Sequence, residues 1–185
     1  MAGPTKPIHP AAVHFPIAFL ALAFGLDILT FASPRLPASI TSQLLPQPDL
    51  HKISYYALTL GLATSVPAVL TGGVEAVKLI SKQGMYEADG KTLRTKVKAT
   101  FAHAITMDTV LAVATYIWMT RRALVTESFS GKMGLATAYS PADWMVGVEA
   151  GLMAVFLFSA GIGGTLVYNY GVGFQSLSAG SKKTQ

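Results

Sequence analysis

Four long apolar stretches, separated by polar segments, dominate the pattern of hydrophobic and polar positions along the chain. They cover residues 13–31, 53–70, 99–119 and 144–167. Each approaches or exceeds the roughly 20 residues that an α-helix needs to cross the hydrocarbon core of a bilayer. The pattern predicts an all-α fold, a four-helix transmembrane bundle. Residues 1–176 are interpreted as its single four-helix membrane domain, and residues 177–185 as a disordered polar tail.

The composition agrees with a membrane protein. Hydrophobic residues make up 51% of the chain and charged residues only 12%, whereas soluble domains carry about 25% charged residues. The chain has no cysteine, which excludes disulfides, thiolate metal sites and cysteine nucleophiles. Only Lys6 is basic before the first apolar stretch, and Asp27 interrupts that stretch. A cleavable signal peptide is therefore not expected, and the first stretch is interpreted as a span.

The distribution of basic residues predicts an orientation. With four spans, both termini and the loop between the second and third spans lie on one side, and nine of the 14 lysines and arginines are there. The positive-inside rule then places the N- and C-termini on the cytoplasmic or matrix side. The lipid bilayer is the expected partner, because no aromatic-rich module that would bind nucleic acid accompanies the basic loop. The other side carries Arg35, Lys52, Arg121, Arg122 and Lys132.

Histidines at the ends of the apolar stretches are the main candidate functional residues. His14 opens the first stretch and His103 the third. An ionisable ring beside hydrocarbon is costly, so each is a functional-site hypothesis by default. His9 precedes Pro10, which predicts an extended conformation outside the helix. His51 opens the second stretch at the opposite interface and is interpreted as a snorkelling side chain.

A weak parallel repeat relates the two halves of the chain. His14 is followed 58 residues later by Gly72, and His103 is followed 60 residues later by Gly163. Each half is thus a helical hairpin that brings a histidine and a Gly-Gly step to the same side of the membrane. The two steps are Gly72-Gly73 and Gly163-Gly164.

This arrangement favours haem b as the cofactor. Two imidazoles that face each other across a bundle are suitable axial ligands for haem iron, and His14 with His103 is the predicted pair. The glycines at 72, 73, 163 and 164 are expected to leave room for the porphyrin. The predicted function is electron transfer with a redox partner protein. No sequence motif assigns a catalytic residue, so the chain is not expected to be an enzyme by itself.

Three alternatives remain open. A non-haem metal could bind to His14 and His103, with His9 and Glu75 as further ligands, since imidazole and carboxylate suit zinc or ferrous iron. A proton-coupled transporter would explain the ionisable Asp27, Asp108 and Glu149, although four helices without broken central segments suit that class poorly. In the third alternative, a structural membrane protein, the histidines are merely hydrogen-bonded.

Several motifs lie between residue 9 and about residue 174: His9-Pro10-x3-His14-Phe15-Pro16 with Asp27, Leu70-Thr71-Gly72-Gly73 with Glu75, Ala102-His103-Ala104, and residues 163–171. Together they resemble those of an integral membrane family, domain of unknown function 2231. The resemblance implies a four-helix membrane protein, and some bacterial relatives are fused to Rieske iron–sulfur domains, which implies a redox context. Members often carry an asparagine about one turn after the third-helix histidine, where this chain has Met107 and Asp108.

Overall fold

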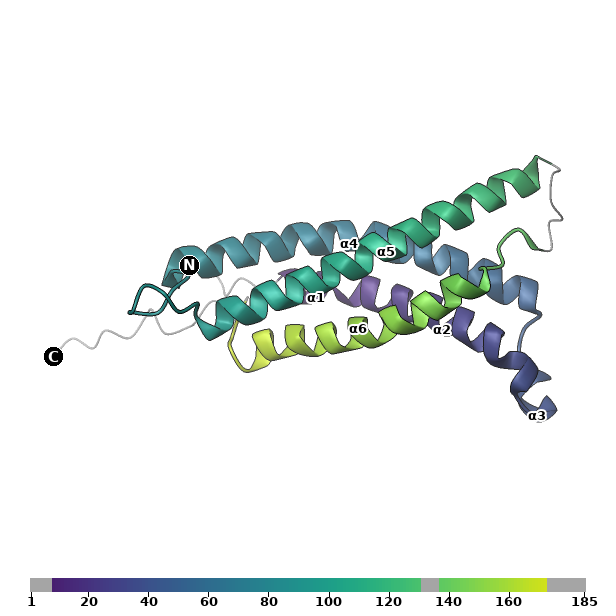
Figure 1. The fold of residues 1–185 in the computed structure, drawn as a ribbon, viewed down its shortest axis with the longest axis horizontal. Coiled ribbons are helices and arrows are strands. Elements are labelled where there is room, and N and C mark those ends of the chain that lie inside the picture. The colour runs from purple at the N-terminus through teal and green to yellow at the C-terminus, as the bar shows by residue number, and fades with distance from the viewer. Residues whose placement is uncertain (1–7, 131–136, 173–185) are drawn as a thin grey trace, which may run out of the picture.

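The computed structural model describes residues 8–130 and 137–172, and its helices form one elongated bundle (Figure 1). Four of them are long and apolar enough to cross a membrane once α1 and α2 are counted together. The predicted all-α, four-span fold is thus confirmed over the described residues; the tail predicted at residues 177–185 lies outside them. The helices are α1 (Ile8–Ala12), α2 (His14–Ala32), η1 (Ser33–Arg35), α3 (Ala38–Thr41), α4 (Gln47–Gln83), α5 (Thr95–Phe129) and α6 (Asp143–Tyr168).

The two central helices are much longer than their apolar stretches. α4 has 37 residues and α5 has 35, so each is about 50–55 Å long at about 1.5 Å per residue. The hydrocarbon core is only about 30 Å thick. Both helices therefore continue into the polar region, where lysine, glutamate and alanine favour helix without favouring lipid.

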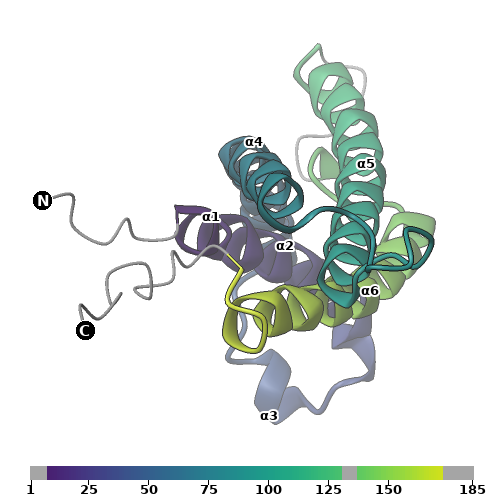
Figure 2. The same cartoon turned by 90° about the vertical axis from the view of Figure 1, so that its left-hand side faces the viewer.

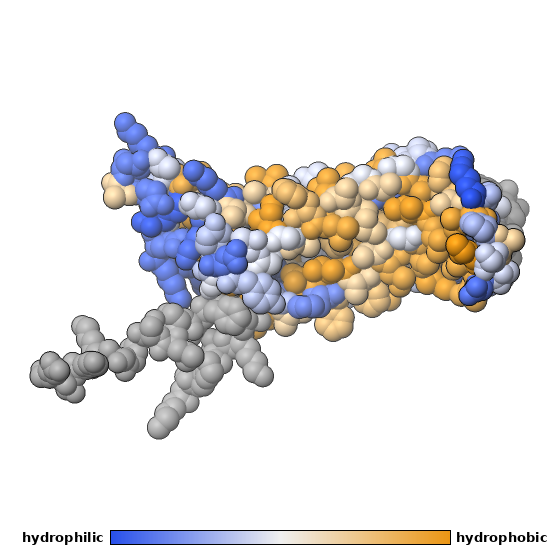
Figure 3. Space-filling view, turned by 90° about the horizontal axis from the view of Figure 1, so that it is seen from below, coloured by the Kyte–Doolittle hydropathy of each residue, from blue (hydrophilic) through white to orange (hydrophobic). Residues whose placement is uncertain are grey.

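The surface of the bundle is apolar along its middle. Figure 3 shows a hydrophobic midsection between two hydrophilic ends. Only 17–33% of the residues in the most hydrophobic window of each span are buried inside the protein. Large side chains such as Leu70, Ile105 and Phe158 are at least 65% exposed. Exposure of so much apolar surface to water would be unfavourable, so this surface is suited to contact with lipid.

The core lies where α2, α4, α5 and α6 meet, and α2 packs closely against α4. Gly61 of α4 allows this close approach, because an added Cβ would lie 2.7 Å from Cδ2 of Leu20 and 3.2 Å from its backbone nitrogen. Small residues of this kind let membrane helices pack closely. The fully buried members of the core include Leu20, Ala23, Phe24, Leu58, Val110, Ala114 and Ile117.

The first helical turn differs from the sequence prediction. His9 lies within α1 rather than in an extended segment, so that prediction was wrong. Pro10 is tolerated because it falls in the first turn, where its missing N–H would have no helical partner. The backbone N–H of Val13 donates to the His9 carbonyl at 3.1 Å. The chain thus enters α2 along a nearly continuous helical path, which keeps the His9 side chain against the bundle.

The loop between α4 and α5 is a compact turn that joins the ends of the two longest helices. Tyr86 and Leu93 form an isolated antiparallel bridge. Both Asp89 carboxylate oxygens accept hydrogen bonds, Oδ1 from the Lys91 and Thr92 backbone N–H groups and Oδ2 from the Thr92 hydroxyl. These bonds hold the pKa of Asp89 down at about 2, with the Thr92 hydroxyl as the largest cause.

Candidate functional site: a histidine-lined cavity

A cavity of about 410 Å³ opens between the helices at the end of the bundle that carries this loop. Figure 2 looks along the bundle from this end and shows α1 and α2 between α4 and α6, with α5 on the right, opposite α1. Every span contributes to its walls, and most of the lining is apolar. The polar lining residues include His9, His14, Glu75, His103 and Asp108.

His9 extends from α1 and is held against α4. Its Nδ1 lies 2.9 Å from the Ala68 carbonyl oxygen and 3.3 Å from the Thr71 hydroxyl. An added Cβ at Gly72 would lie 2.9 Å from Cε1 of the ring. The ring therefore occupies the space that the absent Gly72 side chain leaves on α4.

His103 makes the same contacts between α5 and α6. Its Nδ1 lies 2.9 Å from the Ser159 carbonyl oxygen and 3.2 Å from the Ser159 hydroxyl. An added Cβ at Gly163 would lie 2.9 Å from Cε1 of this ring. In both cases the carbonyl belongs to the residue four positions before the glycine. The same local arrangement of histidine, carbonyl and glycine therefore occurs twice in the bundle.

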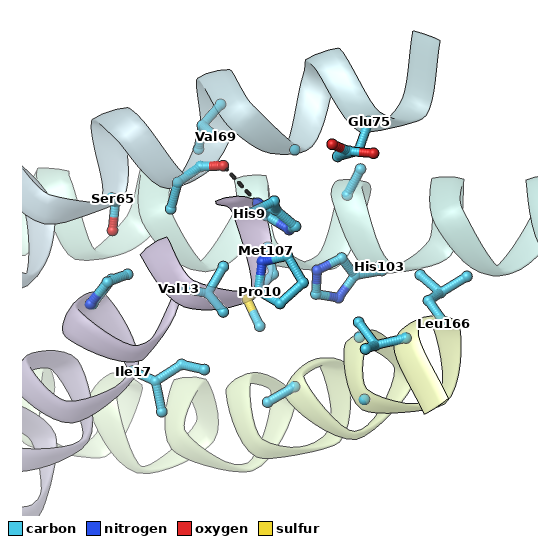
Figure 4. Close-up of a pocket in the computed structure, with 18 of the residues that line it drawn as sticks. His9, Pro10, Val13, Ile17, Ser65, Val69, Glu75, His103, Met107 and Leu166 are labelled. Atoms are coloured by element: carbon cyan, nitrogen blue, oxygen red, sulfur yellow. Dashed lines mark hydrogen bonds between the residues drawn. The ribbon is translucent and has the colours of Figure 1, made fainter. Parts of the chain in front are cut away.

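The carbonyl contacts determine the tautomer of both rings. A carbonyl oxygen only accepts, so Nδ1 of His9 and of His103 must carry the proton and donate it. In the neutral rings Nε2 then has a free lone pair, and neither Nε2 makes a hydrogen bond to another described residue. Figure 4 shows both rings extending toward the cavity. An anchored Nδ1 with a free Nε2 is the arrangement typical of histidines that ligate a metal.

The other predicted site residues lie around these two rings with different surroundings. His14 borders the cavity but its side chain is exposed. Glu75 is paired with Lys78 at 3.4 Å. Gly73 and Gly164 line the cavity with open space where a Cβ would lie. Among the described residues, no three histidine, aspartate or glutamate side chains are placed to hold one metal ion.

The family comparison identifies the chain at this point. A family model described as "Predicted membrane protein (DUF2231)" matches residues 5–176. The chain belongs to this family. No curated protein and no solved structure matches it.

The DUF2231 motifs, which are far apart in the sequence, meet at the cavity. The first supplies His9 and His14, the second supplies Gly72 with Glu75, and the third supplies His103. The last motif adds the lining residues Gly163, Gly164, Leu166, Val167 and Tyr168. Asp27, which was quoted with the first motif, lies toward the opposite end of the bundle in a second polar cluster with Arg121.

Sequence reasoning missed Arg121. It follows the third apolar stretch and was interpreted as a loop cation, but its side chain is only 1% exposed and lies 2.6 Å from Asp27. His51 was interpreted as an isolated snorkelling ring, yet its Nδ1 lies 3.8 Å from the Asp27 carboxylate. One signal in the sequence could have revealed this cluster. The spans contain buried acids that need a cation, and Arg121 is near enough to an apolar stretch to supply it.

Proposed function

We propose that this DUF2231 protein binds haem b in the cavity, where His9 and His103 would hold its iron, and serves in electron transfer. The observation that carries the proposal is the pair of equivalent imidazoles, one from each half of the chain. Each has its Nδ1 anchored on a backbone carbonyl at 2.9 Å and its Nε2 free. His9 replaces His14 in the predicted pair, because the His14 side chain is exposed and has no such anchor.

The lining of the cavity fits a large, flat, mainly apolar ligand. Val13, Ile17 and Leu111 contribute hydrocarbon walls. Open space lies beside Gly73 and Gly164, so no side chain would keep a flat ligand away from the helix backbone at these two positions. Haem b supplies a one-electron iron couple when bound, and the potential of that couple depends on its axial ligands and on the polarity of the pocket. The chain itself contributes ring orientation, ligand basicity and exclusion of water.

The basic residues at this end of the bundle suit the propionate groups of such a ligand. Lys96 lies near the first turn of α5, where its Nζ donates to the Tyr170 carbonyl at 3.1 Å. Lys78 lies one turn after the cavity-lining Glu75 on α4. Neither lysine lines the cavity itself, but both are on helices that do, toward the end of the bundle that carries the α4–α5 loop. A carboxylate-bearing edge would therefore face this end of the bundle.

A structural role for the same histidines is the second candidate. The contacts of His9 join α1 to α4, and those of His103 join α5 to α6. Interhelical hydrogen bonds of this type hold membrane helices together without any cofactor. The two candidates differ in what a visible spectrum would detect. A non-haem metal site is less favoured, because the described residues do not gather three suitable ligands.

The test is the visible absorption spectrum of the full-length protein purified from haem-replete cells. We expect a low-spin, six-coordinate haem spectrum that His9→Ala or His103→Ala abolishes, because each change removes one axial ligand. His14→Ala and His51→Ala are the matched controls and should keep it. A colourless, folded protein whose spectrum does not change with added haemin would contradict the proposal. Loss of the spectrum in His14→Ala alone would restore His14 as the ligand.

A further inference from the structure

A second buried site lies toward the other end of the bundle and shares no residue with the histidine cavity. All four spans contribute to it. α2 supplies Asp27, α4 supplies Ser54 and His51, α5 supplies Arg121, and α6 supplies Glu149. The side chains of Asp27, Ser54 and Glu149 are 0% exposed, and that of Arg121 is 1% exposed. The site therefore buries two carboxyl groups with one guanidinium.

The close contact of Arg121 is with only one of the two carboxyl groups, and its Nε is buried without a hydrogen-bond partner. Its Nη1 donates to Asp27 Oδ2 at 2.6 Å, and its Nη2 donates to the Tyr139 carbonyl at 2.8 Å. The Ser54 hydroxyl donates to the same Asp27 oxygen at 2.5 Å. Oδ2 of Asp27 is thus well satisfied as an ionised oxygen. The Oε1 atom of Glu149 lies 3.9 Å from Arg121 Nη1, which is too far for a hydrogen bond.

Three oxygens of the site have no donor among the described residues. They are Oδ1 of Asp27 and both Oε1 and Oε2 of Glu149, all of them buried. An ionised carboxylate with no hydrogen bond in a buried, lipid-surrounded site is very costly, and such a group takes up a proton instead. A proton on Glu149 would turn one acceptor into a donor. The two carboxyl groups lie against the same nitrogen of Arg121, since Nη1 is 2.6 Å from Asp27 Oδ2 and 3.9 Å from Glu149 Oε1.

We propose that Asp27 and Glu149 form a proton-binding site, in which Glu149 carries the proton and donates it to Oδ1 of Asp27. One bound proton then satisfies two of the three orphaned oxygens. It also makes the charges balance, since Asp27 and Arg121 form a neutral pair and Glu149 is neutral. The proton resides on Glu149 because Asp27 has the close guanidinium and Glu149 does not.

His51 gives this proton a route to the interface. Its Nδ1 is buried without a hydrogen-bond partner and faces Asp27 Oδ1 at 3.8 Å, while the side chain as a whole is 15% exposed. One bridging water or a small rotation closes that distance. On release, the Glu149 O–H bond breaks and its electron pair stays on the Glu149 carboxylate. Asp27 Oδ1 accepts the proton and passes it to His51 Nδ1, which becomes an imidazolium.

The other titratable groups around the site do not replace these partners. Tyr55 of α4 presents its ring to the Arg121 guanidinium, with the centroid 5.8 Å from Cζ. Tyr139 of the preceding loop bonds Arg121 through its backbone carbonyl. Arg122 stacks on Trp118, and Asp143 is exposed in the first turn of α6. The proton site thus consists of Asp27, Glu149 and His51, with Arg121 as the fixed countercharge.

Infrared difference spectroscopy of the full-length protein in lipid vesicles tests the proposal. At neutral pH we expect the carbonyl stretch of a neutral carboxylic acid, which shifts in D₂O. The band should be lost in Glu149→Gln, shifted in Asp27→Asn, and unchanged in Asp108→Asn, an exposed acid on α5. If Glu149→Gln does not fold, ¹³C-labelled glutamate in the wild-type chain should shift the band without any mutation.

The exchange route has its own readout. His51→Ala should slow the D₂O shift of the acid band, whereas His14→Ala, at the other end of the bundle, should not. Absence of an acid band at neutral pH, or a band that moves with sodium concentration and not with pH, would overturn the proton site. Equal exchange rates in wild type and His51→Ala would overturn the route. None of these outcomes depends on whether the cavity binds haem.

Discussion

At the scale of single residues, the histidine rings lie where a glycine leaves the surface of the facing helix bare. An added Cβ would come within 2.9 Å of Cε1 of His9 at Gly72 and of His103 at Gly163. The next glycine in each pair, Gly73 or Gly164, has open space at the same position. The first glycine of each pair thus leaves room for the histidine ring, and the second borders the open space of the cavity.

This difference predicts opposite outcomes for two neighbouring substitutions. Gly163→Ala should displace the His103 ring and lower the free energy of unfolding by about 1–3 kcal/mol, the usual cost of overpacking. Gly164→Ala should have no such cost, and the better helix propensity of alanine is worth up to about 1 kcal/mol. Thermal unfolding in detergent measures both. Equal destabilisation by the two changes would contradict this account of the ring position.

The Asp89 turn gives a second prediction at the residue scale, in a segment outside the spans. Because the pKa of Asp89 is lowered to about 2, its contribution to folding is complete above its unfolded pKa of about 4. That contribution is lost as the pH falls through about 2. Carboxyl ¹³C chemical shifts of labelled aspartate measure the midpoint. Thr92→Val should move the midpoint toward the ordinary value, and an unchanged midpoint would exclude the Thr92 hydroxyl as the main cause.

At the scale of the helices, Arg121 joins three elements of the bundle through one side chain. Its guanidinium contacts Asp27 of α2, the His51 carbonyl of α4 and the Tyr139 carbonyl before α6. Lipid-facing apolar surfaces resemble each other and give little specificity to helix pairing. A buried charge with a fixed set of partners supplies that specificity at this end of the bundle.

Removing this cation should therefore be much more costly than removing its neighbour. Arg121→Met leaves the Asp27 carboxylate buried without a countercharge, which we expect to cost about 3–5 kcal/mol. Arg122→Met is the matched control, because Arg122 is exposed and only stacks on Trp118 at 5.2 Å, which is worth about 0.5–1 kcal/mol. Chemical unfolding followed by tryptophan fluorescence compares them. A similar loss in both variants would show that the buried pair contributes little.

At the scale of the whole molecule, the two polar sites lie toward opposite ends of the bundle. The cavity lies beside the basic α4–α5 loop, and the carboxyl site lies toward the first and third connections. If the bundle spans the membrane, each site is near a different face. Which face is cytoplasmic or matrix-facing stays a prediction from the positive-inside rule.

Cysteine labelling tests that orientation. The chain has no cysteine, so a single introduced thiol has no background. We expect Lys91→Cys, in the α4–α5 loop, to react with an impermeant maleimide only from the cytoplasmic or matrix side of sealed vesicles. Ser39→Cys, in α3 of the first connection, should react only from the other side. Reaction of both from one side would contradict the four-span topology.

The sequence by itself determined the four spans, the end at which the candidate histidines gather, and the family motifs. These features depend on neighbouring residues, because the length of an apolar stretch and the residue types at its end are local properties. An even number of spans then brings His9, Gly72, His103 and Gly163 to one end in any four-helix arrangement. The haem assignment and the topology, which rest on these features, stay predictions.

Only the tertiary structure decided which histidine turns inward and which cation is buried. His9 and not His14 faces α4 because the rotation of α1 is set by packing against residues about 60 positions away. Arg121 is buried because Asp27, 94 residues earlier in the chain, lies opposite it. The local pattern shows that Asp27 interrupts an apolar stretch and needs a cation, but it does not show which basic residue supplies that cation. Helix rotation and packing depend on distant contacts, and these assign the roles of individual side chains.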